Sequence, residues 1–321
     1  MGQSAGSMSV NYLQASPLAK GLFHKAFGMS ASTIKGPGSE TGALAVAEAE
    51  GVKLQQALKA ASLAAMRAVS SDRVVAAAQT ADVRTAPIVD GYFLPAHTSE
   101  IFAAGRQHDV PIVVGSTAND IGTNSDIRRA ATLAEYRAAA AKVYGAHADG
   151  FLAAFPAATD ADVRPAAERA SVASGMGLGA RSWAKAQTMT GKAPAYLFRF
   201  SRTQPYVPGL TFADHDPATV GAYHTGDVPY WLDTQDSLNL FRKTRNWDGY
   251  DRDLATMMSD IVVAFARTGI PSTPAVKMVP YRVNGEQLVD FGDAITVVKL
   301  DSKALDFVAN TPVIPSGPPR R

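Results

Sequence analysis

The sequence has 321 residues, 46% of them hydrophobic, a formal net charge of +2 and no cysteine. The near-neutral charge favours neither a nucleic acid nor an acidic membrane surface as partner, and without cysteine there is no disulfide, thiolate zinc site or cysteine nucleophile. No apolar run reaches the roughly 18 residues of a membrane span, the N-terminus shows no signal-peptide pattern, and compartment and oligomeric state are left open.

The first six residues contain a G-x-S-x-G pattern formed by Gly2, Ser4 and Gly6. This pattern is typical of a nucleophile elbow, a sharp strand-to-helix turn that exposes a serine hydroxyl. Glycine on either side lets the chain bend tightly and lets neighbouring backbone come close. The same letters also occur by chance in a flexible tail, so the pattern alone makes Ser4 only a candidate nucleophile.

Helical and extended patterns alternate after the elbow. We expect a helix to about Gln14 that stops near Pro17, and a short strand over Lys25–Ser30. A Gly/Pro loop follows at residues 36–38. The alanine-rich stretch Leu44–Gln79 carries apolar residues at helical spacing and predicts two helices.

The middle of the chain contains the clearest strand. Pro87–Pro95 is predicted to be a loop and turn, and Val110–Gly115 is an apolar run ended by glycine. Such a run is typical of a strand buried on both faces of a parallel sheet. Leu133–Tyr144 and Glu168–Met189 predict two helices, and Ala195–Phe200 predicts a further strand.

The strongest helical signal is Asp251–Gly269, where Asp251 is the expected N-cap and Gly269 ends the helix. Its apolar residues fall on one face, so we interpret it as a packing helix without a catalytic role. Two late strands are predicted at Gln287–Phe291 and Ile295–Lys299.

Helices that alternate with apolar strands indicate an α/β fold. We see no internal repeat and no clear domain linker. The sequence therefore predicts a single domain over residues 1–310, followed by a Pro-rich flexible tail over residues 311–321.

A serine nucleophile needs a histidine to take its proton and a carboxylate to hold that histidine. In α/β-hydrolases these residues follow each other in the order serine, acid, histidine, so the acid should follow a central strand. Asp120, in the loop after Gly115, has that place, although a solvated loop aspartate remains the alternative. Six histidines compete for the role of base: His24, His97, His108, His147, His215 and His224. His215 lies between two aspartates, a weak metal-binding signal.

The segment around the elbow resembles the type B carboxylesterases, the family of the bacterial esterases and the cholinesterases. The elbow continues as Q-S-A-G-S-M-S-V-N-Y-L at residues 3–13, and S-P-L-A-K-G-L-F-H-K-A-F follows at residues 16–27. Residues 87–95, P-I-V-D-G-Y-F-L-P, are similar to the family's P-V-x-D-G-x-x-L-P. The resemblance extends to about Leu300, nearly the whole chain.

The same resemblance selects the acid and the base. The family's G-x-x-x-D-E-G places the acid at Asp120, where most members have glutamate, with Asn119 in place of the preceding aspartate and one extra residue before Gly122. Residues 221–230, G-A-Y-H-T-G-D-V-P-Y, are similar to G-[AV]-x-H-x-x-E-[IL]-P-[YF]. This match makes His224 the expected base, with Asp227 in place of the family's glutamate.

The resemblance implies an α/β-hydrolase fold and hydrolysis of a small-molecule carboxylic ester through an acyl-serine. Ser4 would attack, His224 would move the proton, Asp120 would orient the imidazole, and the N–H of Ala5 would donate to the oxyanion. The resemblance implies no metal and no organic cofactor.

Two departures limit this expectation. An elbow normally follows a strand, but only Met1 precedes this one, and the H-G-G loop that supplies the second oxyanion donor occurs nowhere in the sequence. We therefore expect an N-terminally truncated α/β-hydrolase fold, the C-terminal part of a carboxylesterase, without ester turnover by this chain alone. The alternative is a non-catalytic esterase-like remnant or binding module; the presence of all three triad positions favours an enzyme.

Overall fold

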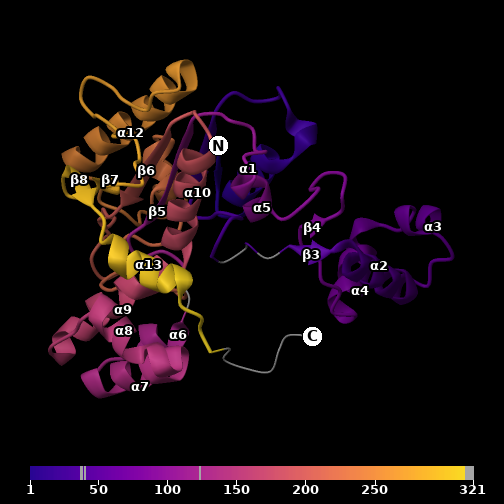
Figure 1. Cartoon of the computed structure of the whole chain (residues 1–321), viewed down its shortest axis with the longest axis horizontal. Helices are drawn as coiled ribbons and strands as arrows, with labels where there is room; N and C mark the ends of the chain where they lie inside the picture. The colour runs from indigo at the N-terminus through magenta and orange to yellow at the C-terminus, as the bar shows by residue number, and fades with distance from the viewer. Residues whose placement is uncertain (37–38, 40, 123, 315–321) are drawn as a thin grey trace.

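A computed structural model of the chain describes residues 1–36, 39, 41–122 and 124–314. Its centre is a six-stranded sheet in the order β1-β2-β5-β6-β7-β8, with helices on both faces (Figure 1). Neighbouring strands are parallel except for the antiparallel pair β7–β8. The strands are β1 (Gly2–Gln3), β2 (Ala26–Met29), β5 (Ile112–Thr117), β6 (Ala195–Phe200), β7 (Gln287–Phe291) and β8 (Ile295–Lys299). The five strands predicted after the elbow are all present.

Helices cover both faces of the sheet, so every residue of β2 and β5 is buried, as their apolar sequences predict. Aromatic and aliphatic side chains of the sheet pack on one face against α11 (Val228–Trp231) and α12 (Gly249–Thr268). On the other face they pack against α1 (Ala5–Ala15), α5 (Thr98–Ala103) and α10 (Met176–Thr190).

Strand β5 continues past Gly115 to Thr117, so the prediction that this glycine ends the strand is wrong. Gly115 pairs with Phe198 of β6. A Cβ at Gly115 would lie 2.4 Å from Cγ of Phe198, so glycine is needed here to let the ring pack on the strand. The strand therefore ends three residues before Asp120.

The single helix predicted over residues 168–189 is two helices, α9 (Asp160–Ser174) and α10, separated at Gly175. The helical pattern hides this break because apolar residues continue through it. At Gly175 the chain contacts the loop after β5: a Cβ there would lie 2.5 Å from the carbonyl oxygen of Ile121. The interruption brings α9 and the acid-bearing loop together.

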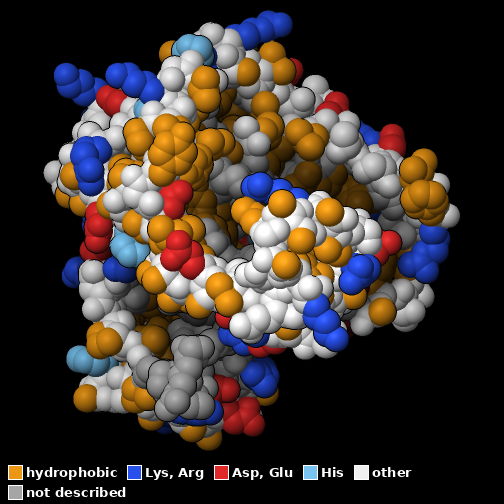
Figure 2. All heavy atoms as spheres, turned by 90° about the vertical axis from the view of Figure 1, so that its right-hand side faces the viewer, with side chains coloured by type: hydrophobic (Ala, Val, Ile, Leu, Met, Phe, Trp, Pro, Cys, Tyr) orange, Lys and Arg blue, Asp and Glu red, His pale blue; other side chains and the backbone are white. Residues whose placement is uncertain are grey.

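Residues 44–79 form three helices rather than the predicted two: α2 (Leu44–Leu58), α3 (Leu63–Arg67) and α4 (Ser71–Thr80). Ser62 starts the additional helix because its side chain accepts a hydrogen bond from the N–H of Ala65. These helices form a lobe apart from the sheet (Figure 1), and apolar side chains are visible on its surface (Figure 2). The exposed ones include Leu44, Val46, Val52, Leu63 and Val75.

Helix α12 has the predicted apolar face, but its N-cap is Asp248 rather than Asp251. The two residues form a capping box, in which Asp248 accepts from the N–H of Asp251 and Asp251 accepts from the N–H of Asp248. The predicted helix Leu133–Tyr144 is α7. The other elements are β3 (Gly42–Ala43), β4 (Ile88–Val89), α6 (Ser125–Arg129), α8 (Ala148–Ala154), α13 (Ser302–Asn310) and three short 3-10 turns.

The loop predicted over residues 87–95 includes the two-residue strand β4, which pairs with β3. Positions 37 and 38 of the predicted Gly/Pro loop, and residues 315–321 of the predicted tail, lie outside the described residues. In the described part of the chain, no helix is both long and apolar enough to cross a membrane.

Candidate active site

Ser4 lies between the end of β1 and the start of α1, as an elbow requires. Its backbone has φ 55° and ψ −120°, a conformation that costs a non-glycine residue on the order of 1–3 kcal/mol. Two backbone hydrogen bonds hold the turn: the N–H of Ser4 donates to Met29 O at 2.8 Å, and the N–H of Met8 donates to Ser4 O at 3.1 Å. The half-buried Ser4 is thus fixed in a strained turn at the sheet edge.

The two glycines of the pattern have different roles. A Cβ at Gly2 would lie 2.2 Å from the carbonyl oxygen of Gly6, so the turn excludes a side chain there. Apart from its chain neighbours and the adjacent backbone of α1, a Cβ at Gly6 would meet no described atom within 4 Å. Gly2 therefore satisfies the expectation of a close backbone approach, and Gly6 does not.

Asp120 is completely buried and its carboxylate accepts three hydrogen bonds. Oδ2 accepts from the N–H of Thr117 at 3.0 Å, and Oδ1 accepts from the N–H of Ile121 at 2.7 Å. The third donor is Nδ1 of His224, 2.6 Å from Oδ1. The loop after β5 therefore holds the Asp120 carboxylate rigidly, shielded from solvent, against the imidazole of His224.

His224 donates to Asp120 from Nδ1, which leaves a lone pair on Nε2 as the proton-accepting site. Nε2 lies 3.2 Å from Nε2 of Gln3, the residue before Ser4. Within the described residues no hydrogen bond joins Ser4 to His224. The fold thus brings Asp120 and His224 into direct contact, and places the Ser4 turn beside them through Gln3.

Asn119 joins the loops that carry the acid and the histidine. Its backbone N–H donates to Ala222 O at 3.0 Å, and its side-chain Oδ1 accepts from the N–H of Ala222 at 3.0 Å. Its Nδ2 donates to Glu168 Oε2 of α9 at 2.9 Å. From the sequence, Asn119 is recognisable only as a departure from a motif, because the partners that give it this role are 49 and 103 residues away.

Asp227 lies three residues after His224 and has a different environment from Asp120. Its carboxyl is fully buried; Oδ2 accepts from Trp231 Nε1 at 3.2 Å, and Oδ1 has no partner in the described structure. Burial, and next the repulsion of Asp120, raises the pKa of Asp227 to about 7. It does not hydrogen-bond the imidazole, so Asp120 is the acid that the geometry pairs with His224.

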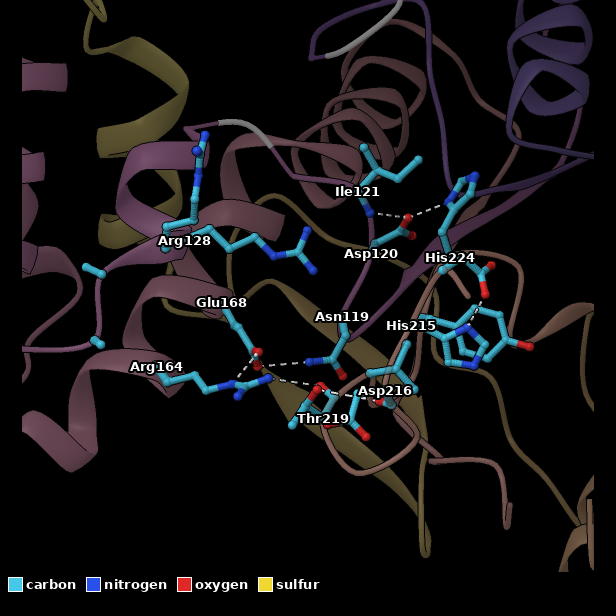
Figure 3. A pocket seen from close by; sticks show the side chains of 16 residues that line it. Asn119, Asp120, Ile121, Arg128, Arg164, Glu168, His215, Asp216, Thr219 and His224 are labelled. Carbon is cyan, nitrogen blue, oxygen red and sulfur yellow. Dashed lines mark hydrogen bonds and ion pairs between the residues drawn. The ribbon is translucent and has the colours of Figure 1, made fainter. Parts of the chain in front are cut away.

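A cavity of about 810 Å³ opens beside this pair (Figure 3). Asp120 and His224 line one side, and α6 contributes Arg128 to the other. Arg164 of α9 is held on the wall by Glu168, whose Oε1 accepts from its Nε at 3.3 Å, and by the carbonyl oxygen of Thr219 at 3.1 Å. The site therefore has space for a small molecule next to the imidazole.

The alternative histidine His215 also lines this cavity, but it makes other contacts. Its Nε2 lies 3.0 Å from the hydroxyl of Tyr206, and its Nδ1 lies 2.9 Å from Asp214 Oδ1. Across the described residues, no group of three or more His, Cys, Asp or Glu side chains is placed to hold a metal ion. His108 lies near Ser16 O at 2.6 Å, away from Asp120.

The N–H of Ala5 is the first of α1 and makes no recorded hydrogen bond in the described structure. The first N–H groups of a helix have no intrahelical partner, and the helix dipole gives them a partial positive charge. This N–H can therefore donate a hydrogen bond to an anionic oxygen held close to Ser4.

A mostly parallel sheet, covered by helices and with the elbow at the end of one strand, is an α/β-hydrolase fold. The chain belongs to the carboxylesterase family, whose model matches residues 1–307.

Two known proteins and one solved structure illustrate the relationship. The chain is 28% identical to the fumonisin B1 esterase of Sphingopyxis macrogoltabida over 307 residues, 92% of this chain and 53% of that protein. It is 25% identical to the para-nitrobenzyl esterase of Bacillus subtilis over 311 residues, 92% of this chain and 58% of that protein. A solved PNB esterase structure shares the fold with a TM-score of 0.65 at 22% identity, over 96% of this chain and 62% of the other. The chain thus spans somewhat more than half the length of these relatives.

Proposed function

We propose that this chain carries the Ser–His–Asp triad of a carboxylic-ester hydrolase that acts through an acyl-serine intermediate. The observation that carries the proposal is the 2.6 Å hydrogen bond between Asp120 and His224, with the strained Ser4 turn next to the imidazole. The relatives' names, a fumonisin B1 esterase and a para-nitrobenzyl esterase, support ester chemistry. The substrate is a small-molecule carboxylic ester that occupies the cavity beside His224.

In the proposed reaction, Oγ of Ser4 attacks the ester carbonyl carbon while Nε2 of His224 takes its proton. Asp120 holds the imidazole in the tautomer that leaves Nε2 free, and stabilises the imidazolium that forms. The N–H of Ala5 donates to the oxygen that becomes negatively charged. His224 then protonates the leaving alcohol. A water molecule, deprotonated by the same nitrogen, attacks the acyl carbon, and His224 returns that proton to Oγ of Ser4 as the acid is released.

This reaction needs a second oxyanion donor. The 321 residues contain no H-G-G segment, and removal of one such donor costs about 2.7–4 kcal/mol of transition-state stabilisation. We therefore propose that residues 1–321 alone have negligible esterase turnover, and that a polypeptide which supplies this loop completes the site.

A chimera tests the triad. The part of the Bacillus subtilis para-nitrobenzyl esterase that precedes its own elbow is joined to this chain, and the product is assayed with short-chain p-nitrophenyl esters and a fluorophosphonate label. We expect hydrolysis and labelling that both require Ser4, while Ser9→Ala, an exposed serine on the same helix, leaves both unchanged. His224→Ala and Asp120→Asn should remove most activity.

The same chimera separates an enzyme from a binding module. A folded chimera that neither hydrolyses the esters nor reacts with the fluorophosphonate would contradict the proposal and favour a non-catalytic role. Near-full activity of Asp120→Asn, together with loss of activity in Asp227→Asn, would show that the acid is Asp227.

A further inference from the structure

A second cavity, of about 330 Å³, lies between the sheet and helices α9, α10 and α13. Figure 1 shows α13 between the strands and helices α8 and α9, and Ala304 and Leu305 of this helix line the cavity. Its volume lies in the range of small-molecule sites. It has none of the described residues that line the cavity beside His224, so it is a separate site.

The interior of this second cavity is apolar. Strands β6 and β7 and helices α10 and α13 contribute aliphatic or aromatic side chains that are themselves almost completely buried. They include Ala180, Leu197, Phe198, Leu288 and Ala304. An aliphatic chain bound here would leave water for an apolar surface, which is favourable in proportion to the area buried.

Four cations line the same cavity, and two of them are neutralised by the protein. Arg181 pairs with Glu286 and Asp306, each at 2.7 Å, and Arg199 pairs with Asp290 at 2.7 Å. Arg181 and Arg199 are therefore neutralised by the protein, and neither has an unpaired charge for a ligand.

The other two cations, Arg169 and Lys299, are exposed, and their side chains make no hydrogen bond or ion pair with any residue that the structure describes. Among the described residues that line the cavity, the one acidic side chain is Asp301. It caps α13 instead, by accepting from the N–H groups of Lys303 at 3.1 Å and Ala304 at 3.2 Å. The rim of an apolar cavity therefore has two available positive charges.

We propose that this second cavity binds a medium-chain aliphatic carboxylate, such as octanoate. Its hydrocarbon chain lies in the apolar interior, and its carboxylate lies at the rim with Arg169 and Lys299. A charge-assisted hydrogen bond to a guanidinium or ammonium compensates the carboxylate for partial loss of water. The site requires neither Ser4 nor His224, so it stands independently of the proposed ester hydrolysis.

Isothermal titration calorimetry on the 321-residue chain tests this site with octanoate, butanoate and octan-1-ol as probes. We expect one octanoate per chain. Each methylene removed between octanoate and butanoate should weaken binding about two- to four-fold, because it removes apolar burial. Octan-1-ol, which has the same chain without the charge, should bind at least about ten-fold more weakly than octanoate.

Charge variants give the sharper comparison. Arg169→Gln and Lys299→Gln remove exposed cations and should preserve the fold; each should weaken octanoate binding by about ten-fold and leave octan-1-ol binding unchanged. The matched control is Arg128→Gln, which removes a cation from the cavity beside His224. His224→Ala is a second control, and neither control should alter octanoate binding.

Several results would overturn the proposal. They are absence of octanoate binding, equal affinities for octanoate and octan-1-ol, or unchanged octanoate binding in both Arg169→Gln and Lys299→Gln. Weaker octanoate binding in Arg128→Gln or His224→Ala would instead assign the carboxylate to the cavity beside His224, and would also reject the second site.

Discussion

Gln3 Nε2 lies 3.2 Å from His224 Nε2, so the residue before the candidate nucleophile, rather than Ser4 itself, hydrogen-bonds the imidazole. With Nδ1 of His224 donating to Asp120, the amide of Gln3 donates to the lone pair on Nε2. In the proposed reaction this lone pair would accept the proton of Ser4, so Gln3 would first have to move away from Nε2.

Replacement of Gln3 in the chimera should change how activity depends on pH. In Gln3→Glu a carboxylate replaces the amide donor, and a negative charge at this distance stabilises the protonated imidazole. A protonated His224 cannot act as base, so the acid limb of the kcat/KM profile should move to higher pH by about one unit. Gln56→Glu, which adds the same charge at an exposed glutamine of α2, is the comparison. An unchanged acid limb in Gln3→Glu would contradict the contact.

The raised pKa of Asp227 predicts a pH-dependent stability. Because its folded-state pKa, about 7, lies above the unfolded value, the stabilising contribution is complete at low pH and is lost as the pH rises to 7. Asp227→Asn is neutral at every pH. Urea unfolding should therefore show the variant gaining stability relative to the wild type by up to about 1.4 kcal/mol per pH unit between about pH 4 and 7.

The control for that experiment is Asp260→Asn, an exposed aspartate on α12. Its stability difference from the wild type should stay flat over the same pH range. A flat difference in Asp227→Asn as well would mean that the Asp227 carboxyl keeps an ordinary pKa in the folded protein.

Asn119→Ala should loosen the contact between the acid and histidine loops. The variant loses the side-chain hydrogen bonds to Glu168 and to the N–H of Ala222, each contributing about 1 kcal/mol. We expect about 1–3 kcal/mol less stability in urea unfolding, and lower kcat/KM in the chimera, because His224 is less well positioned. Asn246→Ala, whose side chain is exposed, should change neither quantity. Equal effects of the two substitutions would show that Asn119 does not position the histidine loop.

The two elbow glycines give a matched pair of substitutions. Gly2→Ala would put a methyl group 2.2 Å from Gly6 O, and so should disrupt the turn and lower fluorophosphonate labelling of Ser4 in the chimera by at least about ten-fold. Gly6→Ala meets open space and lies inside α1, where alanine is favoured, so it should keep labelling and stability. The reverse order of effects would show that the turn is constrained at Gly6.

Sequence patterns predicted the strands well because the sheet is buried on both faces, and burial leaves apolar runs such as Val110–Gly115. These patterns failed where a tertiary contact determines where a helix or strand ends. The break at Gly175 depends on its close approach to Ile121, and the continuation of β5 through Gly115 depends on the ring of Phe198. The start of α3 depends on the N-cap Ser62, which the continuous helical spacing across residues 44–79 does not reveal.

For the site, motif spacing identified the side chains that the fold brings together in Asp120 and His224. It could not identify Gln3 as a contact of the imidazole or Asn119 as the connection between two loops. A hydrogen bond between residues 103 or 221 positions apart leaves no trace in local spacing. The roles of Ser4 and Ala5 stay predictions until the chimera is assayed.

The strands that precede Asp120 and Ser4 differ in length and in the number of neighbouring strands that pair with them. Asp120 follows β5, six residues long and paired with both β2 and β6, whereas Ser4 follows β1, two residues long and paired in the described sheet with β2 alone. Local opening costs least free energy where the fewest hydrogen bonds and buried contacts break. The serine turn should therefore open and close many times while the acid and histidine stay in place. Backbone amides around residues 2–4 would exchange with solvent long before those of residues 112–117, and loss of the nucleophile's geometry would precede global unfolding.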